Sequence, residues 1–431
     1  AVDRRAAPAK PGWLLAGYRA ATRVAAPAAP LLLQYRERHG KEESGRRGER
    51  FGKTAMPRPE GTLVWFHAAS VGETNMLLPL IDTLRPVRPD VRVLLTTMTV
   101  TSAALAGRRL SPADVHQYVP LDVPRFVRRF LDHWKPALAV FAESEIWPNL
   151  ILETAARGVP LALVNARISD RSYARWRRHR RVAESLLGRF DAVLAQNETL
   201  ARRFRELGAR AVEAVGNLKI DAPPPPVDAA AFQALQRALG GRPVLVAAST
   251  HEGEERIVAA AHRQLAQRLD GFCSIVVPRH PERGTAIAEL LTQLGLSIRQ
   301  RSLGGLPERA CDVYIADTIG ELGTFYALAP VAFIGGSLVP HGGQNPIEAV
   351  RSGAAVLTGP HWHNFQDAYR SLFEHDGAVR IHDADGLAAA VLRLLADDSA
   401  LRAARQGAEA ALATMSGALR RTTESLLRLL P

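Results

Sequence analysis

Cysteine is scarce in this sequence: Cys273 and Cys311 are the only two among 431 residues. Neither belongs to a C-x-x-C pair, so we expect neither a disulfide framework nor a cysteine-rich zinc site, and a reducing cytoplasm fits. The sequence also lacks an H-E-x-x-H motif and any His, Asp and Glu cluster with metal-ligand spacing. Its single D-x-D triplet, Asp383 to Asp385, opens an apolar helical pattern and predicts a helix cap. We therefore expect no metal site.

Long apolar runs are missing as well. No window reaches the roughly 18 uninterrupted apolar residues that a membrane-spanning helix needs. Residues 12–41 instead mix apolar side chains with arginines, and Pro27 and Pro30 interrupt any helix there. This mixture predicts a monotopic segment that lies in the headgroup layer of a membrane. The alternative is a helix packed on the first domain.

Acidic residues are few near the N-terminus. The first 60 residues hold thirteen Lys and Arg residues against six Asp and Glu residues, in a chain whose formal net charge is +12. Such an excess indicates an anionic partner, either phospholipid or nucleic acid. Because arginine far outnumbers lysine, a GC-rich genome is an alternative explanation of part of the excess.

From residue 62 onward, short apolar segments alternate with helical patterns, in a chain that is 47% hydrophobic and 23% charged. Repeated βα units predict parallel sheets covered on both faces. Four prolines in residues 221–227 cannot continue a helix or a central strand, so they predict a boundary between two α/β domains and a cleft that binds ligands. We expect a basic, part-apolar segment at 1–50, a Rossmann-like domain at 51–222, and a second at 223–431 whose last helix is long enough to cross back to the first. The predicted strands are 62–66, 91–97, 137–143, 160–166 and 192–197 in the first domain and 243–249, 273–278, 312–317, 330–336 and 354–359 in the second.

The segment HAASVGET, residues 67–74, contains an acid with two possible roles. Ser70 and Glu73 have the spacing of a capping box, in which the serine caps a helix and the glutamate folds back to the cap N–H. The same position, at the carboxyl end of a strand in an open α/β sheet, is where catalytic groups lie. Glu73 is therefore a cap or a catalytic base, and Glu143 and Glu145, which also follow a strand, are alternative bases.

A glycine-rich segment at 331–353 is the most specific in the second domain. A predicted strand ends in Gly335, Gly336 and Ser337, and a helix is expected to begin at Asn345, with Glu348 in its first turn. Glycines let backbone N–H groups approach an anion, and a helix start presents its positive end to a phosphate. Glu348 is expected either to complete the cap or to bind the hydroxyls of a ribose.

Other polar groups follow strands of the same predicted sheet and favour a nucleotide as ligand. They are Ser249, Arg279, His280, Asp317 and Thr318.

Nine motifs, in this order and at these spacings, resemble those of the 3-deoxy-D-manno-octulosonic acid (Kdo) transferase family, over about residues 35–370. They are FHAASVGETN, FAESEIWPNLI, NARISDRSYARW, AQNE, GNLKID, VPRHPER, DTIGELGTFY, GGSLVPHGGQNPIEA and GPHWHNFQD. The resemblance implies an α/β enzyme of the GT-B type, with two Rossmann-like doubly wound domains facing across a cleft. It implies an inverting glycosyltransferase of lipopolysaccharide biosynthesis that moves Kdo from CMP-Kdo to the glucosamine disaccharide of a lipid A precursor, without a metal or other cofactor. The implied location is the cytoplasmic face of the bacterial inner membrane, peripheral or monotopic, on an anionic lipid surface.

The resemblance also implies roles for single residues. It places the base at Glu73. We assign the CMP-Kdo site to Lys219, Ser249, Arg279, His280, Thr318, Gly320, Glu321, Gly335, Gly336, Ser337, Asn345 and Glu348. Further substrate contacts are assigned to Ser70, Gly72, Glu143, Glu145, Arg167, Arg171 and Ser172. The arginine run at 175–181 departs from the family pattern.

Two other functions remain open. One is another GT-B enzyme, a transferase or an epimerase that uses a UDP-sugar. The other is a nucleic-acid-binding protein that uses the arginine run at 175–181, although the sequence shows no aromatic stacking platform and no readout helix.

Overall fold

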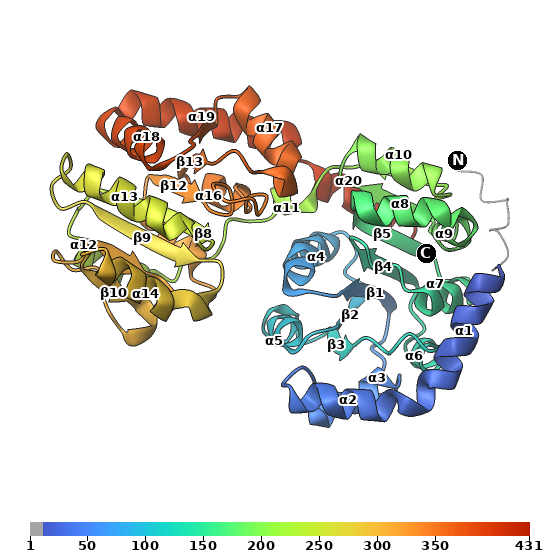
Figure 1. The fold of residues 1–431 in the computed structure, drawn as a ribbon. Helices are drawn as coiled ribbons and strands as arrows, with labels where there is room; N and C mark the ends of the chain where they lie inside the picture. Colours follow the sequence, from blue (N-terminus) through green and yellow to red (C-terminus); the bar gives the residue numbers. More distant parts are fainter. Residues whose placement is uncertain (1–11) are drawn as a thin grey trace. The chain divides into compact units, whose positions relative to one another are not determined.

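A computed structural model describes residues 12–431. The basic residues Arg4, Arg5 and Lys10, part of the predicted membrane-associating segment, lie outside the described residues. The chain divides into two compact units (Figure 1). The first unit ends at Ala222 and also contains Ser416–Pro431, and the second spans Pro223–Met415.

The first unit is built on a seven-stranded sheet with the order β3-β2-β1-β4-β5-β6-β7, and all its strands pair in parallel. Its strands are β1 (Thr62–Ala68), β2 (Val91–Thr97), β3 (Val115–Tyr118), β4 (Leu138–Ala142), β5 (Leu161–Ala166), β6 (Ala192–Ala195) and β7 (Val212–Ala214). Its helices are α1 (Trp13–Ala25), α2 (Ala29–Arg38), α3 (Arg47–Arg50), α4 (Val71–Leu84), α5 (Val100–Arg109), α6 (Pro124–Trp134), α7 (Pro148–Ala155), α8 (Asp170–Arg178), α9 (Arg180–Leu187), α10 (Glu198–Glu206), α11 (Leu218–Asp221) and α20 (Ala418–Leu427).

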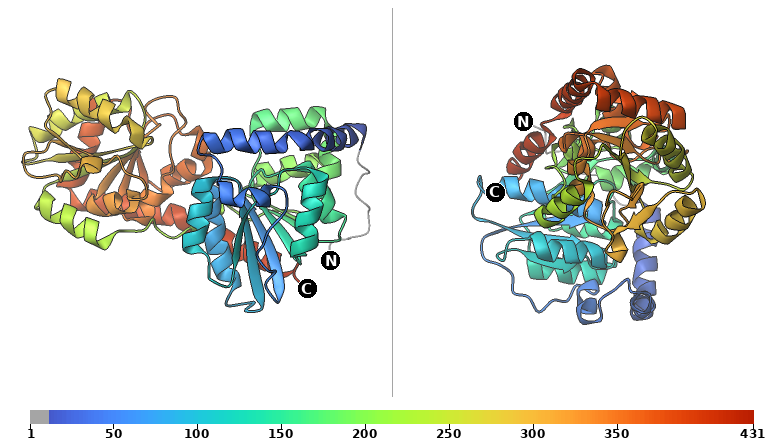
Figure 2. Two further views of the ribbon diagram at one scale, coloured as in Figure 1. Left: turned by 90° about the horizontal axis from the view of Figure 1, so that it is seen from below. Right: turned by 90° about the vertical axis from the view of Figure 1, so that its left-hand side faces the viewer.

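Helices cover both faces of this sheet, as Figure 2 shows for the strands fanned between them. Successive residues of β1 point to opposite faces. Leu63 and Trp65 therefore belong to the apolar cluster formed with α6, α7, α9 and α10, whereas Val64 and Phe66 belong to the cluster formed with α4, α5 and α20. A central strand buried on both sides is mostly apolar, and this explains the apolar run that predicted β1.

The second unit has a seven-stranded parallel sheet with the order β10-β11-β9-β8-β12-β13-β14. Its strands are β8 (Val244–Thr250), β9 (Cys273–Pro278), β10 (Ile298–Gln300), β11 (Val313–Ile315), β12 (Val331–Ile334), β13 (Ala355–Thr358) and β14 (Ala378–Arg380). Its helices are α12 (Ala229–Leu239), α13 (Glu254–Ala266), α14 (Gly284–Gln293), α15 (Leu322–Leu328), α16 (Ile347–Arg351), α17 (Gln366–Glu374), α18 (Ala384–Ala396) and α19 (Asp398–Met415). The predicted cap at the D-x-D triplet is confirmed, because the Asp383 carboxylate accepts a hydrogen bond from the Gly386 N–H at 2.8 Å.

The N-terminal helices pack on the first unit by one face only. Leu15 of α1 is buried in the core, and the Tyr18 hydroxyl donates to the Asp122 carboxylate at 2.9 Å. On the other face, Trp13 is 81% exposed and Leu31 of α2 is 70% exposed. The segment is thus a packed helix pair that still shows apolar side chains to solvent. No helix among residues 12–431 combines the length and the apolar character needed to cross a bilayer.

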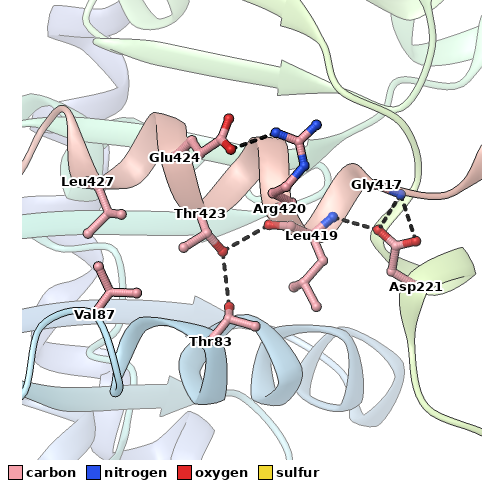
Figure 3. A pocket seen from close by; sticks show the side chains of 9 residues that line it. All are labelled: Thr83, Val87, Asp221, Gly417, Leu419, Arg420, Thr423, Glu424 and Leu427. Atoms are coloured by element: carbon pink, nitrogen blue, oxygen red, sulfur yellow. Dashed lines mark hydrogen bonds and ion pairs between the residues drawn. The ribbon is translucent and has the colours of Figure 1, made fainter.

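The C-terminal helix α20 lies against α4 in the first unit (Figure 3). At its start, the Asp221 carboxylate accepts hydrogen bonds from the backbone N–H groups of Gly417 at 3.0 Å and Leu419 at 2.6 Å. Further along, the Thr423 and Thr83 hydroxyls are 3.0 Å apart. A hollow of about 470 Å³ lies beside these contacts, and none of the predicted site residues lines it.

Candidate active site

The strand order of each sheet reverses at one strand, and ligands of open α/β sheets bind where the loops leaving such a strand and its neighbour diverge. In the first unit this point lies between β1 and β4, and in the second between β8 and β12. Glu73 follows β1, and Glu143 and Glu145 follow β4. The three candidate bases therefore lie at the switch point of the first sheet.

Glu73 takes part in the cap of α4. The Ser70 hydroxyl oxygen accepts from the Glu73 N–H at 3.3 Å, and the Glu73 carboxylate accepts from the Ser70 hydroxyl at 3.1 Å. The predicted cap is confirmed with one correction, because the carboxylate reaches the N–H of Ala69 at 2.7 Å and not that of Ser70. Ser70 is extended, with φ −127° and ψ 166°, which is the usual conformation of an N-cap residue.

The surroundings of Glu73 make it a stronger base. Burial raises the pKa of its carboxyl above the ordinary value, and the negative charges of Glu145 and Glu143 raise it further. The hydrogen bonds from Ala69 and Ser70 oppose this rise only in part. A carboxylate whose pKa lies closer to the working pH accepts a proton more readily in a transition state.

Glu145 is held by fixed partners. The Trp147 indole N–H donates to its Oε2 at 2.6 Å, and Nε2 of the fully buried His67 lies 3.4 Å from the same oxygen without hydrogen-bond geometry. Burial alone would raise the pKa of Glu145, but His67 and Trp147 hold it below its ordinary value. Glu145 therefore stays ionised and is a weaker base than Glu73.

Glu143 is neutralised by two cations. Its carboxylate lies 2.7 Å from Lys219 Nζ and 3.6 Å from Arg167 Nη1. Lys219, assigned to the donor site from the sequence, is thus placed in the first unit beside Glu143. Glu143 and the neighbouring Asn165 both have positive φ, at 49° and 51°, and such backbone strain clusters at functional sites.

Arginines line one face of α8. Arg171, Arg175 and Arg178 are exposed at i, i+4 and i+7 and have no ion pair in the described part of the chain, whereas Tyr173 and Trp176 contact the core. Ser172 lies in the first turn, where its N–H donates to the Ser169 cap at 3.2 Å. Gly72, in the first turn of α4, is exposed.

In the second unit, the glycine-rich loop after β12 holds a carboxylate of the protein itself. The fully buried Glu254 accepts hydrogen bonds from the backbone N–H groups of Gly336 at 2.7 Å and of Ser337 and Leu338 at 3.0 Å each. The Gly335 N–H donates to a β8 carbonyl. This corrects the prediction that these N–H groups are open to a phosphate.

Ser249 and Glu252, where β8 leads into α13, also have the S-x-x-E spacing of a capping box. Ser249 does not cap a helix: it has φ +56°, and α13 begins at Glu254, whose carboxylate also accepts from the His251 N–H at 2.9 Å. The S-x-x-E pattern of Ser249 and Glu252 is therefore not a cap.

The predicted helix start at Asn345 is confirmed to within one or two residues, since α16 begins at Ile347. The Asn345 side-chain oxygen accepts from the Ile347 N–H at 3.1 Å, and its amide donates to Glu348 at 3.2 Å. Burial raises the pKa of Glu348, whereas Asn345 and Arg279 act against the rise. Because α16 has only five residues, its dipole is weaker than the predicted phosphate-binding helix start would need.

The loop after β11 carries the remaining predicted donor residues. The Glu321 carboxylate pairs with Arg301 at 2.6 Å and accepts from the Thr318 hydroxyl. Gly320 has φ +88°, a conformation that favours glycine. Arg279 and His280 follow β9, and both are exposed.

Comparison with known proteins bears on this arrangement. The family model described as 3-Deoxy-D-manno-octulosonic-acid transferase (kdotransferase) matches residues 45–222. The 3-deoxy-D-manno-octulosonic acid transferase of Bordetella pertussis is 37% identical over 418 residues, which cover 92% of this chain and 96% of that protein. The one from Haemophilus influenzae is 34% identical over 381 residues, covering 87% and 88%. The chain belongs to the 3-deoxy-D-manno-octulosonic acid transferase family.

Membership of the Kdo transferase family confirms that the chain is a glycosyltransferase. A solved glycosyltransferase from Rickettsia africae is similar in fold, with a TM-score of 0.60 at 11% identity over 86% of this chain and 99% of that one. The α/β fold of the GT-B type is therefore confirmed as well.

Sequence reasoning missed several side chains of this Kdo transferase-family site. His251 and His341 lie in the strand-end loops that were singled out, so their position in those loops was the available signal. His67 stands in the motif of Glu73, but its burial against Glu145 needs the fold. Among residues 12–431, no group of three or more His, Cys, Asp or Glu side chains could hold a metal ion.

Proposed function

We propose that this chain transfers Kdo from CMP-Kdo to the glucosamine disaccharide of a lipid A precursor, with inversion at the anomeric carbon. The acceptor hydroxyl attacks C2 of Kdo, the new C–O bond forms as the bond to the phosphate oxygen breaks, and CMP leaves with the electron pair. The hydroxyl proton passes to Glu73. Membership of the Kdo transferase family supports the reaction, and the carboxylate with a raised pKa at the switch point of the first sheet supports the base.

The cap and the base are compatible roles for Glu73. An ionised carboxylate offers about four acceptor positions, and the Ala69 N–H and the Ser70 hydroxyl fill two of them. The remaining positions can accept the hydroxyl of the sugar while the cap fixes the carboxylate in place. A positioned base of this kind contributes roughly 10² to 10⁴ in rate.

We propose that protein groups, without a metal, stabilise the charge on the departing CMP. The exposed Arg279 guanidinium has no ion pair within residues 12–431 and lies near enough to influence Glu348. A cation held in place at the leaving group stabilises charge as it develops, at little reorganisation cost. Asn345 and Glu348 are proposed to hold the ribose.

We further propose that the protein works at the cytoplasmic face of the inner membrane as a peripheral protein. Trp13 and Leu31 supply exposed apolar side chains, and Arg171, Arg175 and Arg178 supply a cationic stripe. Like charges at i, i+4 destabilise a helix by a few tenths of a kcal/mol per pair unless an anion neutralises them. Each basic residue near an anionic leaflet contributes about 1 kcal/mol to binding.

The membrane part is tested by co-sedimentation with vesicles of phosphatidylethanolamine and phosphatidylglycerol, and with vesicles of phosphatidylcholine alone. Replacing Trp13 and Leu31 by Ser is expected to weaken binding to the anionic vesicles, and so is replacing Arg175 and Arg178 by Gln. The matched control is the double variant Arg256→Gln and Arg268→Gln, which removes the same charge from exposed positions of the second unit. Equal loss in the control, or tighter binding to duplex DNA than to the vesicles, contradicts the proposal.

The reaction is tested with purified protein, CMP-Kdo and a lipid A precursor, and the product is followed by mass spectrometry. Donor binding is tested separately by competition with CMP and with UDP. Product formation, together with preference for CMP, supports the proposal. Binding of UDP in place of CMP would instead favour a UDP-sugar transferase or epimerase.

A further inference from the structure

Three imidazole rings lie around the glycine-rich loop of the second unit. The rings of His251 and His341 are stacked, with centroids 4.2 Å apart and planes 21° apart, and His280 meets His251 edge-on at 6.0 Å. The Gln344 side-chain amide lies 3.0 Å from His251 Nε2. A Cβ on Gly336 would come within 3.2 Å of the His251 ring, so the glycine leaves room for it.

The fold brings these rings together from separate elements. His251 follows β8, His280 follows β9, and His341 follows β12. In the sheet, β8 lies between β9 and β12, so the three loops leave the same edge side by side. This edge includes the switch point of the second unit, where ligands of such sheets bind.

The groups whose charges act on the pKa of His251 are all basic: His341, His280, Arg279 and Arg283. Four acids lie in the same loops: Glu282 after β9, which is 3.6 Å from His280 Nδ1, and Glu252, Glu254 and Glu255 before and at the start of α13. Two of these acids already have partners in the protein. Glu254 accepts hydrogen bonds from backbone N–H groups, and Glu255 forms an ion pair with Arg283 at 2.8 Å. The guanidinium of Arg279 stays without an ion pair in the described chain.

The basic neighbours affect the protonation of His251. Burial lowers the pKa of His251, and His341 and His280 lower it further. Arg279 and Arg283 act in the same direction. At neutral pH the ring is therefore mainly uncharged in the free protein, and an anion placed beside it would favour the charged form.

We propose that His251 and His341 form a proton-linked subsite for an anionic group of the cytidylate donor, either its phosphate or the carboxylate of its sugar. This inference rests on the proposed function and names contacts for the same donor. Anion binding offsets the repulsion between the stacked rings and the arginines, so the complex takes up a proton that the free protein lacks. Donor affinity then rises as the pH falls through the neutral range.

The test is isothermal titration calorimetry on the full chain with three probes: CMP, free Kdo and uncharged cytidine. Each is titrated at about pH 8.0 and about pH 6.5, in two buffers of different ionisation enthalpy, so that proton uptake is measured directly. Linkage with CMP alone identifies the phosphate as the group bound, and linkage with Kdo alone identifies the carboxylate. Cytidine is expected to show no linkage.

For one linked proton, the dissociation constant falls by up to about tenfold per pH unit. The variants His251→Gln and His341→Gln are expected to lose the proton uptake and to bind the linked probe at about pH 6.5 as weakly as the wild type does at about pH 8.0. The phosphate of CMP itself titrates near pH 6, but equally for every variant, so wild type and variant are compared at each pH. His382→Gln is the matched control, since His382 is exposed just before α18.

The outcomes separate this inference from the proposed function. Binding of CMP with no proton uptake by either CMP or Kdo, or with uptake unchanged in both histidine variants, overturns the subsite and leaves the proposed function intact. Failure of CMP to bind at any pH contradicts the proposed donor itself. Loss of uptake in His382→Gln as well would show that the effect is not local to the imidazoles, and it too overturns the subsite.

Discussion

Replacing Glu73 by Gln separates its two roles. Glutamine preserves the S-x-x-E/Q capping pattern with Ser70, because its side-chain oxygen still accepts one hydrogen bond at the start of α4. It cannot take a proton from the acceptor hydroxyl. We expect kcat to fall roughly 10²- to 10⁴-fold in Glu73→Gln, and equally in Glu73→Ala, because both lack the base.

The stability of the two variants should differ. Alanine removes both side-chain hydrogen bonds of the cap, which costs about 1 kcal/mol, whereas glutamine changes stability by about half of that or less.

The stability difference between Glu73→Gln and wild type should depend on pH. Because the folded-state pKa of Glu73 is raised, its ionised form costs stability, and this cost is absent below the unfolded pKa of about 4.3 and complete above the folded pKa. The stability of Glu73→Gln relative to wild type should therefore increase as the pH rises through that window.

The assay combines single-turnover transfer of Kdo with thermal unfolding at several pH values. Turnover of Glu73→Gln within a few-fold of wild type would refute the base, and Glu145 would become the candidate. Loss of turnover together with loss of folding in both variants would show that the cap, and not the chemistry, is the essential role. Near-UV circular dichroism shows whether each variant is folded, so that loss of chemistry is distinguished from loss of folding.

Three further predictions follow from charges and hydrogen bonds. Glu145→Gln removes a negative neighbour that raises the pKa of Glu73, so the acidic limb of the kcat/KM profile should shift to lower pH, which a pH–rate series measures. Glu254→Gln leaves up to two of four backbone N–H groups without an acceptor, and we expect a loss of about 3 kcal/mol in urea unfolding. Asp221→Ala removes the cap of α20, and we expect a loss of about 1 to 2 kcal/mol and faster proteolysis near residue 417.

The strands that the sequence did not reveal are the four edge strands of the two sheets. They are β3, β7, β10 and β14, with the sequences VHQY, VEA, IRQ and AVR. A central parallel strand is buried on both faces and is mostly apolar, so a run of apolar residues predicts it. An edge strand is short and pairs on one side only, and polar residues are tolerated in it. Its pattern is too brief to be recognised without its partner.

The sequence predicts where the candidate site lies in the fold, but it does not predict which of its charged side chains form ion pairs. Strand ends in a parallel sheet meet at one edge, so motif positions alone brought the acids and glycines to the switch points. Which groups neutralise one another depends on contacts between distant segments. The sequence has no local sign that Lys219 pairs with Glu143, or that Arg301 pairs with Glu321.

Two glutamates at helix starts show what separates a structural carboxylate from a reactive one. Glu73 lies in the first turn of α4 and Glu254 is the first residue of α13, and each follows the first strand of its sheet and accepts at least one backbone N–H. Glu254 is fully buried and accepts four hydrogen bonds, which fill the roughly four acceptor positions of a carboxylate. Glu73 accepts two, stays partly exposed, and is pushed toward protonation by burial and by two acidic neighbours. A saturated carboxylate must break a hydrogen bond before it can take a proton from a substrate, whereas one with open positions need not. A position near the start of a helix, which the two glutamates share, does not carry this distinction; the number of donors around each carboxylate does.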